Sequence, residues 1–264
     1  MTLTECPAPL VAFAQRLADV GGPIIRRYFR APFAVEGKSD ASPVTIADRE
    51  TEQAMRELLE QTYPDHGVWG EEFGQTRMDA EWVWVLDPID GTRAFASGKP
   101  IFGSLIGLLH CSIPVLGVID QPVLGERWIG GVGVPTTFND TPARTRPCAT
   151  LAEAVAVVSP NGVLEKPDLN LSPYRALAKA CATDSLGGDC YAYGLLSSGF
   201  CDLVCERGLK LHDYAALAPV VTAAGGVMTD WQGQPLGLDS NGEVMATGDR
   251  RVWREALALV KSAS

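Results

Sequence analysis

The sequence predicts a layered α/β (α+β) fold in which helices flank and separate two sheets. Three observations predict it. Apolar residues recur at helical spacing in the first part of the chain, short apolar runs divided by Gly and Pro follow, and strands then alternate with helices. At 264 residues, the chain can form one large domain or two packed halves with a full-sized core.

Two helices are expected first. From Pro7 to Arg30 the apolar residues form one helical stripe, although two adjacent glycines weaken its middle. A second helix is expected from about Ala47 to Tyr63, where Pro64 stops it.

A meander of short strands is expected next. The segment Glu81–Leu86 is rich in Trp and Val and apolar on both faces, which is typical of a buried strand. The meander continues through three more apolar runs: Ile101–Leu109, Val115–Ile119 and Arg127–Gly130. The stretch from about Val134 to Thr150 has no periodicity, so we place a boundary there. It separates an N-terminal α+β subdomain (1–140) from a C-terminal α/β subdomain (141–264).

Strands and helices alternate in the second half. The expected strands are Ala154–Val158, Asp202–Cys205, Gly226–Thr229 and Glu243–Ala246. The expected helices are Pro173–Cys181, Asp189–Ser197, His212–Ala224 and Arg250–Val260.

Composition narrows the class of protein. The 22 Lys and Arg against 32 Asp and Glu give a net charge of −10, and no basic run is present, so a nucleic-acid partner is not expected. No apolar stretch reaches the roughly 20 residues that cross a bilayer, and Met1 to Pro9 lacks a signal-peptide pattern, so we expect a cytoplasmic protein without a membrane partner. Seven cysteines without a C-x-x-C pair indicate neither a disulfide framework nor a zinc site.

Two carboxylates at the end of the strand Glu81–Leu86 are the sharpest feature. The chain runs from this strand through Asp87-Pro88-Ile89-Asp90-Gly91-Thr92. Pro88 and Gly91 are expected to turn the backbone, so that both carboxylates and the Ile89 carbonyl converge. A hard divalent cation such as Mg²⁺ would relieve their repulsion. The alternative, and the usual meaning of a lone D-x-x-D, is a turn with one capping and one solvated Asp.

Further acids lie at the ends of expected elements. Glu71 and Glu72 follow a short apolar segment, Asp213 begins an apolar helix and Asp48 begins the second helix. Taken alone, Asp213 and Asp48 would be helix caps. Acids from several element ends can instead line a shared cleft.

These residues form an inventory for two-metal phosphoryl transfer. Gly91 and Thr92 offer backbone N–H groups and a hydroxyl that can hold a phosphate oxygen. Metals suit the task because uncatalysed hydrolysis of phosphate monoesters needs accelerations of up to about 10²¹. Three His residues and no nucleophile-elbow motif disfavour a covalent Ser or His mechanism.

In these motifs the chain resembles the inositol monophosphatase superfamily of lithium-sensitive, magnesium-dependent phosphatases. The resemblance covers nearly the whole chain, with three motifs in the family's order: Gly70-Glu71-Glu72, Trp84–Thr92, and Asp213–Ala216 followed by Ala224-Gly225-Gly226. It implies an αβαβα sandwich of the sugar-phosphatase type with two mixed or antiparallel sheets. It also implies a homodimer, because the family usually dimerises.

The resemblance implies a role for each site residue. Glu71, Asp87 and the Ile89 carbonyl would hold a first Mg²⁺, while Asp87, Asp90 and Asp213 would hold a second, with two to three Mg²⁺ per site. Gly91 and Thr92 would bind the phosphate. Asp48, Thr92 and Glu71 would be catalytic, and Asp48 and Thr92 would orient a metal-bound water for in-line attack on phosphorus.

Within the superfamily, the sequence looks most like the bacterial histidinol-phosphate phosphatase branch. The implied reaction is hydrolysis of L-histidinol phosphate to L-histidinol in histidine biosynthesis. His212 departs from the branch, which commonly has Pro-Tyr before the metal-binding Asp. The supporting segments are Ser42–Thr45, Ala47–Arg49, Thr92–Phe95, Ile119–Pro122, Glu126–Trp128 and Gly187–Tyr191.

The charge of that substrate gives a separate argument. Histidinol phosphate carries an ammonium and an imidazole, so its pocket needs anions beyond the metal ligands. Asp189 opens an apolar helix and Glu206 lies seven residues before Asp213, so both are candidates. Their alternative roles are a helix cap and a solvated strand end. The full set of candidate substrate-binding residues is Gly91, Thr92, Asp189, Glu206 and Asp213.

Other functions stay open. The same chemistry could act on inositol phosphate, fructose bisphosphate or a 3′-phosphoadenosine nucleotide. Inositol is neutral and would not need Asp189, and no Lys or Arg cluster for a second phosphate stands out between Asp184 and Asp213. A catalytically retired homologue that binds phosphate ligands or protein partners is disfavoured because every metal carboxylate is present. A structural Ca²⁺ module would need a twelve-residue ligand loop that is absent. Arg93 is a substrate, interface or surface residue.

Overall fold

The computed structural model describes residues 5–31, 35–37, 43–160 and 169–263, with only the backbone at 35–37 and 43–45. Ser42, part of one motif above, therefore lies outside the described residues. None of the described helices is long and apolar enough to cross a membrane. The α-helices are α1 (Ala8–Tyr28), α2 (Ile46–Thr62), α3 (Thr92–Ala96), α4 (Ser172–Ala180), α5 (Asp189–Ser197), α6 (Leu211–Ala223) and α7 (Arg250–Ala263).

The first large sheet has eight strands, all between residues 67 and 142. Every neighbouring pair is antiparallel except β3 with β5. In spatial order the strands are β10 (Thr141–Pro142), β9 (Val134–Phe138), β8 (Glu126–Gly131), β7 (Ile113–Gln121), β6 (Gly103–His110), β5 (Trp82–Asp90), β3 (Gly67–Gly70) and β4 (Gly74–Thr76).

The second large sheet is also mixed and has five strands. Their order is β12 (Thr183–Leu186), β11 (Val155–Ser159), β13 (Leu203–Glu206), β15 (Val244–Thr247) and β14 (Val227–Thr229). Strand β11 pairs in parallel with β12 and β13, and β15 pairs antiparallel with β13 and β14. A separate pair, β1 (Val35–Gly37) and β2 (Pro43–Thr45), precedes α2.

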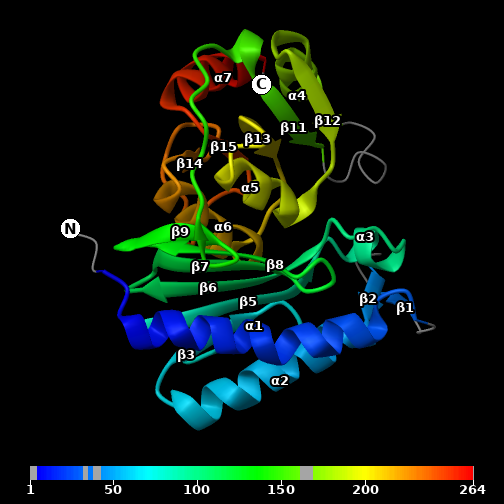
Figure 1. Cartoon of the computed structure of the whole chain (residues 1–264), viewed down its shortest axis with the longest axis vertical. Coiled ribbons are helices and arrows are strands. Elements are labelled where there is room, and N and C mark those ends of the chain that lie inside the picture. The colour runs from blue at the N-terminus through cyan, green and yellow to red at the C-terminus, as the bar shows by residue number, and fades with distance from the viewer. Residues whose placement is uncertain (1–4, 32–34, 38–42, 161–168, 264) are drawn as a thin grey trace.

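The elements stack in five layers (Figure 1). Helices α1 and α2 cover one face of the eight-stranded sheet, α5 and α6 lie between the two sheets, and α4 and α7 cover the far face of the second sheet. Three apolar clusters fill the spaces between these layers. The predicted αβαβα sandwich with two mixed sheets is confirmed.

Strand β5 is the centre of this arrangement. Trp84 and Leu86 are fully buried in the cluster under α1 and α2, while Val83 and Val85 face the cluster around α5 and α6. The prediction that the strand ends at Leu86 in a turn at Pro88 is wrong. The strand continues to Asp90, and its register with β6 shifts between Asp87 and Asp90. Because Pro88 has no N–H to donate to β6, the ladder of hydrogen bonds is interrupted there. The interruption is a β-bulge within the strand, where a turn was expected.

Close packing fixes helix α6 against the first sheet. A Cβ built on Gly117 of β7 would lie 1.8 Å from the backbone oxygen of Ala216. Only glycine therefore allows the two backbones to approach this closely. The close packing places α6, which carries Asp213 in its first turn, against strands β5 to β7.

Several short elements escape the sequence patterns. The stretch predicted to be irregular after Val134 contains β9 and the edge strand β10, which are mostly polar and lack apolar alternation. The exposed strands β4 and β12 and the five-residue helix α3 were likewise not predicted. The division into subdomains 1–140 and 141–264 stays a prediction.

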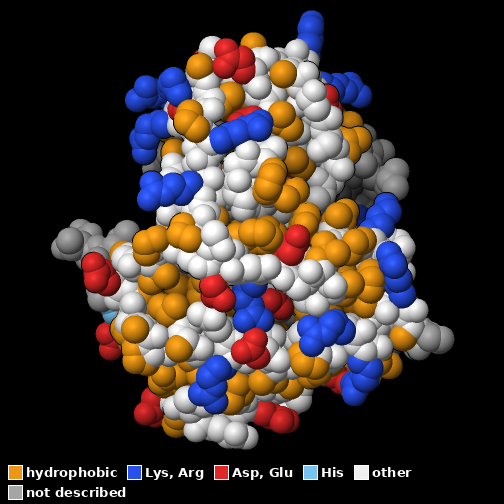
Figure 2. All heavy atoms as spheres, viewed as in Figure 1, with side chains coloured by type: hydrophobic (Ala, Val, Ile, Leu, Met, Phe, Trp, Pro, Cys, Tyr) orange, Lys and Arg blue, Asp and Glu red, His pale blue; other side chains and the backbone are white. Residues whose placement is uncertain are grey.

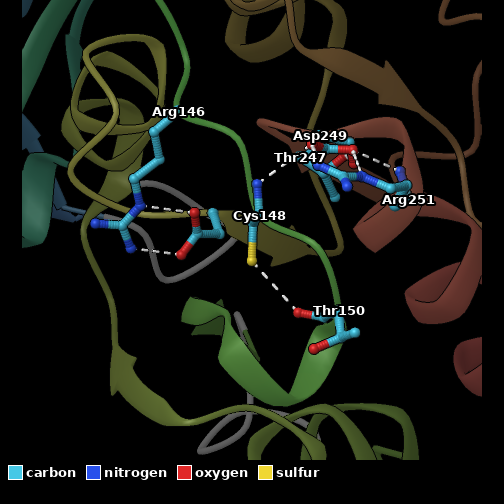
Figure 3. A network of polar contacts seen from close by, with 7 residues as sticks. Arg146, Cys148, Thr150, Thr247, Asp249 and Arg251 are labelled. Carbon is cyan, nitrogen blue, oxygen red and sulfur yellow. Dashed lines mark hydrogen bonds and ion pairs between the residues drawn. The ribbon is translucent and has the colours of Figure 1, made fainter.

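The segment that leads from the first sheet to the second is tied down by polar contacts (Figure 3). Arg146 donates to both oxygens of the buried Asp202, at 2.8 and 2.5 Å. The Cys148 N–H donates to Asp249, which also binds Arg251. Charges of both signs are spread over the face seen in Figure 2.

Candidate active site

The four acidic side chains among the predicted metal ligands come from three parts of the fold. Glu71 follows β3 and donates its backbone N–H to the Leu86 carbonyl of β5 at 3.1 Å. Asp87 and Asp90 flank the bulge in β5, and Asp213 lies in the first turn of α6. The bulge lets the two aspartates approach the same point, because it breaks the strict alternation of side chains in a strand.

These acids come together in space, as the sequence predicts. Ligand atoms of Asp87, Asp90 and Asp213 lie within 4.8 Å of one another, and so do those of Glu71, Asp87 and His212. Asp87 belongs to both groups. The arrangement offers two adjacent sites with Asp87 between them.

The electrostatics of the cluster are unfavourable without a cation. Burial raises the pKa of Asp87 well above its usual range, and the charges of Glu71, Asp90, Asp213 and Asp48 raise it further. Burial also raises the pKa of Asp90, followed by the charges of Asp189 and Asp213.

The residues fit a divalent cation. Asp87 is 2% exposed, and its Oδ1 has no hydrogen-bond partner among the described residues. A buried carboxylate oxygen without a donor is costly. An ion ligated by this oxygen and its acidic neighbours would satisfy it and cancel their repulsion.

The predicted phosphate and catalytic residues border the cluster. Gly91 has φ +84° and links β5 to α3, and the Thr92 hydroxyl donates to the Ile89 carbonyl at 3.0 Å. That carbonyl has a second lone pair, so the contact is compatible with its predicted role as a metal ligand. Asp48 is buried in the first turn of α2, close enough to raise the pKa of Asp87.

Asp189 lies directly against this site. It is the first residue of α5, and a Cβ built on Gly91 would be only 2.7 Å from its Oδ2. Burial raises the pKa of Asp189, while the nearby cations Arg93 and Lys99 lower it. Of the three interpretations of Arg93, a surface charge unrelated to the site is disfavoured, because the Arg93 charge acts on Asp189 beside the site.

Glu206 is buried, so the alternative of a solvated strand end is wrong. It ends β13, a strand covered on both sides by β11 and β15, and is 1% exposed. Tyr193 donates its hydroxyl to Oε2 at 3.0 Å. Burial raises the pKa of Glu206 to about 7, and the charges of Asp189 and Asp213 act in the same direction.

Two supporting contacts were not found from the sequence. The buried Glu52 of α2 accepts hydrogen bonds from the backbone N–H groups of Glu72 and Phe73, so it holds the turn that begins at Glu71. The Cys190 N–H donates to Asp90 Oδ2 at 2.6 Å. Both contacts join residues at least twenty positions apart, which a local pattern does not reveal.

Two of the quoted branch motifs meet beside the site. The Tyr191 hydroxyl donates to Glu126 Oε2 at 2.6 Å, and the Tyr191 ring packs edge-on against Trp128. This contact ties α5, which carries Asp189, to strand β8.

A layered sandwich with acidic side chains gathered at the ends of β3 and β5 and at the start of α6 suits a metal-dependent phosphatase. Comparison with known proteins gives the family. The pattern of the Inositol monophosphatase family matches residues 7–263, so the chain belongs to this family.

Relatives with different substrates are found. The chain is 44% identical over 256 residues to the bifunctional phosphatase IMPL2, chloroplastic, of Arabidopsis thaliana, with 93% of this chain and 73% of that protein covered. It is 33% identical to a histidinol-phosphatase of Chlorobaculum parvum, with 90% and 92% covered. A solved structure of an inositol monophosphatase from Zymomonas mobilis superposes with a TM-score of 0.87 at 48% identity, with 97% and 100% covered.

Proposed function

We propose that this phosphatase hydrolyses histidinol phosphate with the help of Mg²⁺ or a similar divalent ion. The observation that carries the substrate is the pair of carboxylates of the half-buried Asp189 and the buried Glu206, which adjoin the proposed metal ligands. A phosphate monoester without a cationic group would need no carboxylates here beyond those that hold the metal ions. A substrate with its own cation explains that excess.

The electrostatics support this assignment. The charge of Asp189 raises the pKa of both Asp90 and Glu206, so the three carboxylates are near one another. A cationic group bound between Asp189 and Glu206 would lower both pKa values toward normal. The binding energy of the substrate would then offset the cost of burying these charges.

The proposed roles of the chain's residues follow their positions. Gly91 and Thr92 bind the phosphate at the start of α3, and Asp48 and Thr92, with Glu71, orient the attacking water. The residues that would hold the ions are Glu71, Asp87, Asp90, Asp213 and the Ile89 carbonyl. Bound divalent ions supply charge stabilisation for the phosphoryl group and the leaving alkoxide. A homodimer and a cytoplasmic location stay predictions.

Phosphate release from a panel of monoesters tests the proposal. With Mg²⁺ present, we expect histidinol phosphate to give a higher kcat/KM than inositol 1-phosphate or p-nitrophenyl phosphate. The variant Asp189→Ala should lower kcat/KM for histidinol phosphate at least about tenfold, because a hydrogen bond to a charged group contributes about 1.5–3 kcal/mol. Its activity on p-nitrophenyl phosphate should change less than about threefold.

The matched control is Asp184→Ala, which removes an exposed acid from β12 in the same half of the chain. It should leave both activities unchanged. Equal losses on both substrates in Asp189→Ala would remove Asp189 from substrate recognition. No activity on histidinol phosphate in the wild type would refute the substrate.

Inositol 1-phosphate is the second candidate. The 48% identity to an inositol monophosphatase of Zymomonas mobilis favours it. Under this alternative, Asp189 would accept hydrogen bonds from neutral hydroxyls, and its removal would cost less than the loss of an ion pair.

A further inference from the structure

His212 stands beside the proposed metal ligands, at a position that the sequence left without a role. It is the second residue of α6 and is 7% exposed. Its Nε2 lies 3.6 Å from Asp213 Oδ1 and 3.9 Å from Glu71 Oε1. Both distances exceed those of a hydrogen bond, so neither contact accounts for the imidazole.

The surroundings of His212 have the dimensions of an ion site. A ring nitrogen of His212 and oxygens of Glu71 and Asp87 lie within 4.8 Å of one another. Ligands about 2.1 Å from a shared ion lie roughly 3–4 Å apart, so small side-chain rotations suffice. The second, independent observation is the buried Asp87 Oδ1, which lacks a hydrogen-bond partner in the described part of the chain.

The donor set of this group differs from that of its neighbour. Asp87, Asp90 and Asp213 offer only oxygen, which suits Mg²⁺. The group with His212 adds an imidazole nitrogen, which suits first-row transition ions and which Mg²⁺ does not favour.

We propose that His212 is a metal ligand and that the site formed with Glu71 and Asp87 selects a first-row transition ion such as Mn²⁺ or Co²⁺ over Mg²⁺. This inference rests on the proposed metal-dependent hydrolysis, but not on the identity of the substrate. The all-oxygen group keeps its preference for Mg²⁺. The two adjacent sites would therefore hold different ions.

Metal binding in the absence of substrate tests the inference. Titration of the metal-free protein with Co²⁺, followed by its visible absorption, reports changes in the ligands and geometry of the ion, and calorimetry gives the affinities for Mn²⁺ and Mg²⁺. For His212→Gln, we expect Co²⁺ and Mn²⁺ to bind at least about tenfold more weakly and the Co²⁺ spectrum to change. Binding of Mg²⁺ should change less than about threefold.

The control is His110→Gln. His110 ends β6 and contacts Glu81 at 2.9 Å, outside the group of ligands. This variant should bind all three ions as the wild type does. Should His212→Gln fail to fold, His212→Phe keeps a planar aromatic ring and removes the nitrogens, with circular dichroism to check the fold.

An unchanged Co²⁺ affinity and spectrum in a folded His212 variant would overturn the inference, as would equal losses for Co²⁺ and Mg²⁺. A wild type that binds no divalent ion would overturn both this inference and the proposed hydrolysis. Inactivity on histidinol phosphate combined with the expected loss of Co²⁺ binding would refute the substrate alone.

Discussion

Replacing Asp87 by Asn should stabilise the protein when no metal is bound. The same substitution should abolish phosphatase activity in the presence of metal. Asp87 is buried and shared by both candidate ion sites. Asn has nearly the same volume but carries no charge. The substitution therefore removes the repulsion within the cluster and, at the same time, the ligand that both ions would share.

The magnitude follows from the geometry. Two ionised carboxylates 4.8 Å apart repel by about 3.5 kcal/mol at an effective dielectric constant of 20. Protonation limits the cost, because holding an ordinary carboxyl protonated at pH 7.5 costs at most about 5 kcal/mol. We expect Asp87→Asn to raise the metal-free unfolding free energy by about 2–4 kcal/mol, or Tm by about 5–10 °C.

The direction in which stability changes with pH follows from the pKa of Asp87, which is raised in the folded state. Between the unfolded value, near 3.8, and the folded value, the folded protein binds the extra proton, so stability falls as pH rises through this window. The wild type without metal should therefore lose stability above about pH 4, and Asp87→Asn should lose less.

Thermal unfolding after chelation, and again with excess Mg²⁺ or Mn²⁺, measures both effects. The matched control is Asp202→Asn, which also neutralises a buried Asp but one that is paired with Arg146. It should destabilise by about 1–3 kcal/mol. If metal-free Asp87→Asn is less stable than the wild type, or if metal raises its Tm equally, the reasoning about the cluster is wrong.

Two further predictions concern Glu206 and Gly91. The raised pKa of Glu206, about 7, means that the folded state binds its proton up to that pH, so the wild type should lose up to about 3 kcal/mol as pH rises from about 4.5 to 7. Urea unfolding at pH 5 and pH 8 should show a smaller loss in Glu206→Gln, and an equal loss would contradict the assignment. Gly91→Ala should lower kcat/KM for histidinol phosphate at least about tenfold, because its Cβ would displace Asp189. Gly98→Ala, also at positive φ but with no atom closer than 3.4 Å, should stay active, and equal rates in the two variants would count against the contact.

The sequence predicts best what is decided locally. Helix α5 has the expected bounds, and α1 and α2 differ from theirs by two residues at most, because apolar spacing, proline and capping signals act within one turn. The acidic residues at the ends of helices and strands could be predicted as well, because the signals that mark those ends are also local. Strand β12 was missed because its four residues are all exposed and carry no apolar alternation.

What the sequence could not give depends on packing between distant segments. The burial of Glu206 follows from the position of β13 between β11 and β15, which no pattern within residues 203–206 reveals. The approach of His212 to Glu71 joins residues 141 positions apart. The bulge after Asp87 was read as a turn because Pro and Gly favour both, and only pairing with β6 distinguishes them.

The sequence set a helix cap against a metal ligand as alternatives for Asp213, yet the structure allows both. Its Oδ2 accepts the Lys210 N–H at 2.6 Å, which closes the first turn of α6, while its Oδ1 is the oxygen near His212. Asp90 divides its oxygens in a similar way, because Oδ2 accepts the Cys190 N–H. One oxygen of each carboxylate thus fixes an element, and the other is left for the cluster. Loss of the ions would therefore raise the charge repulsion without releasing the side chains, which keeps the site preformed for the next cation.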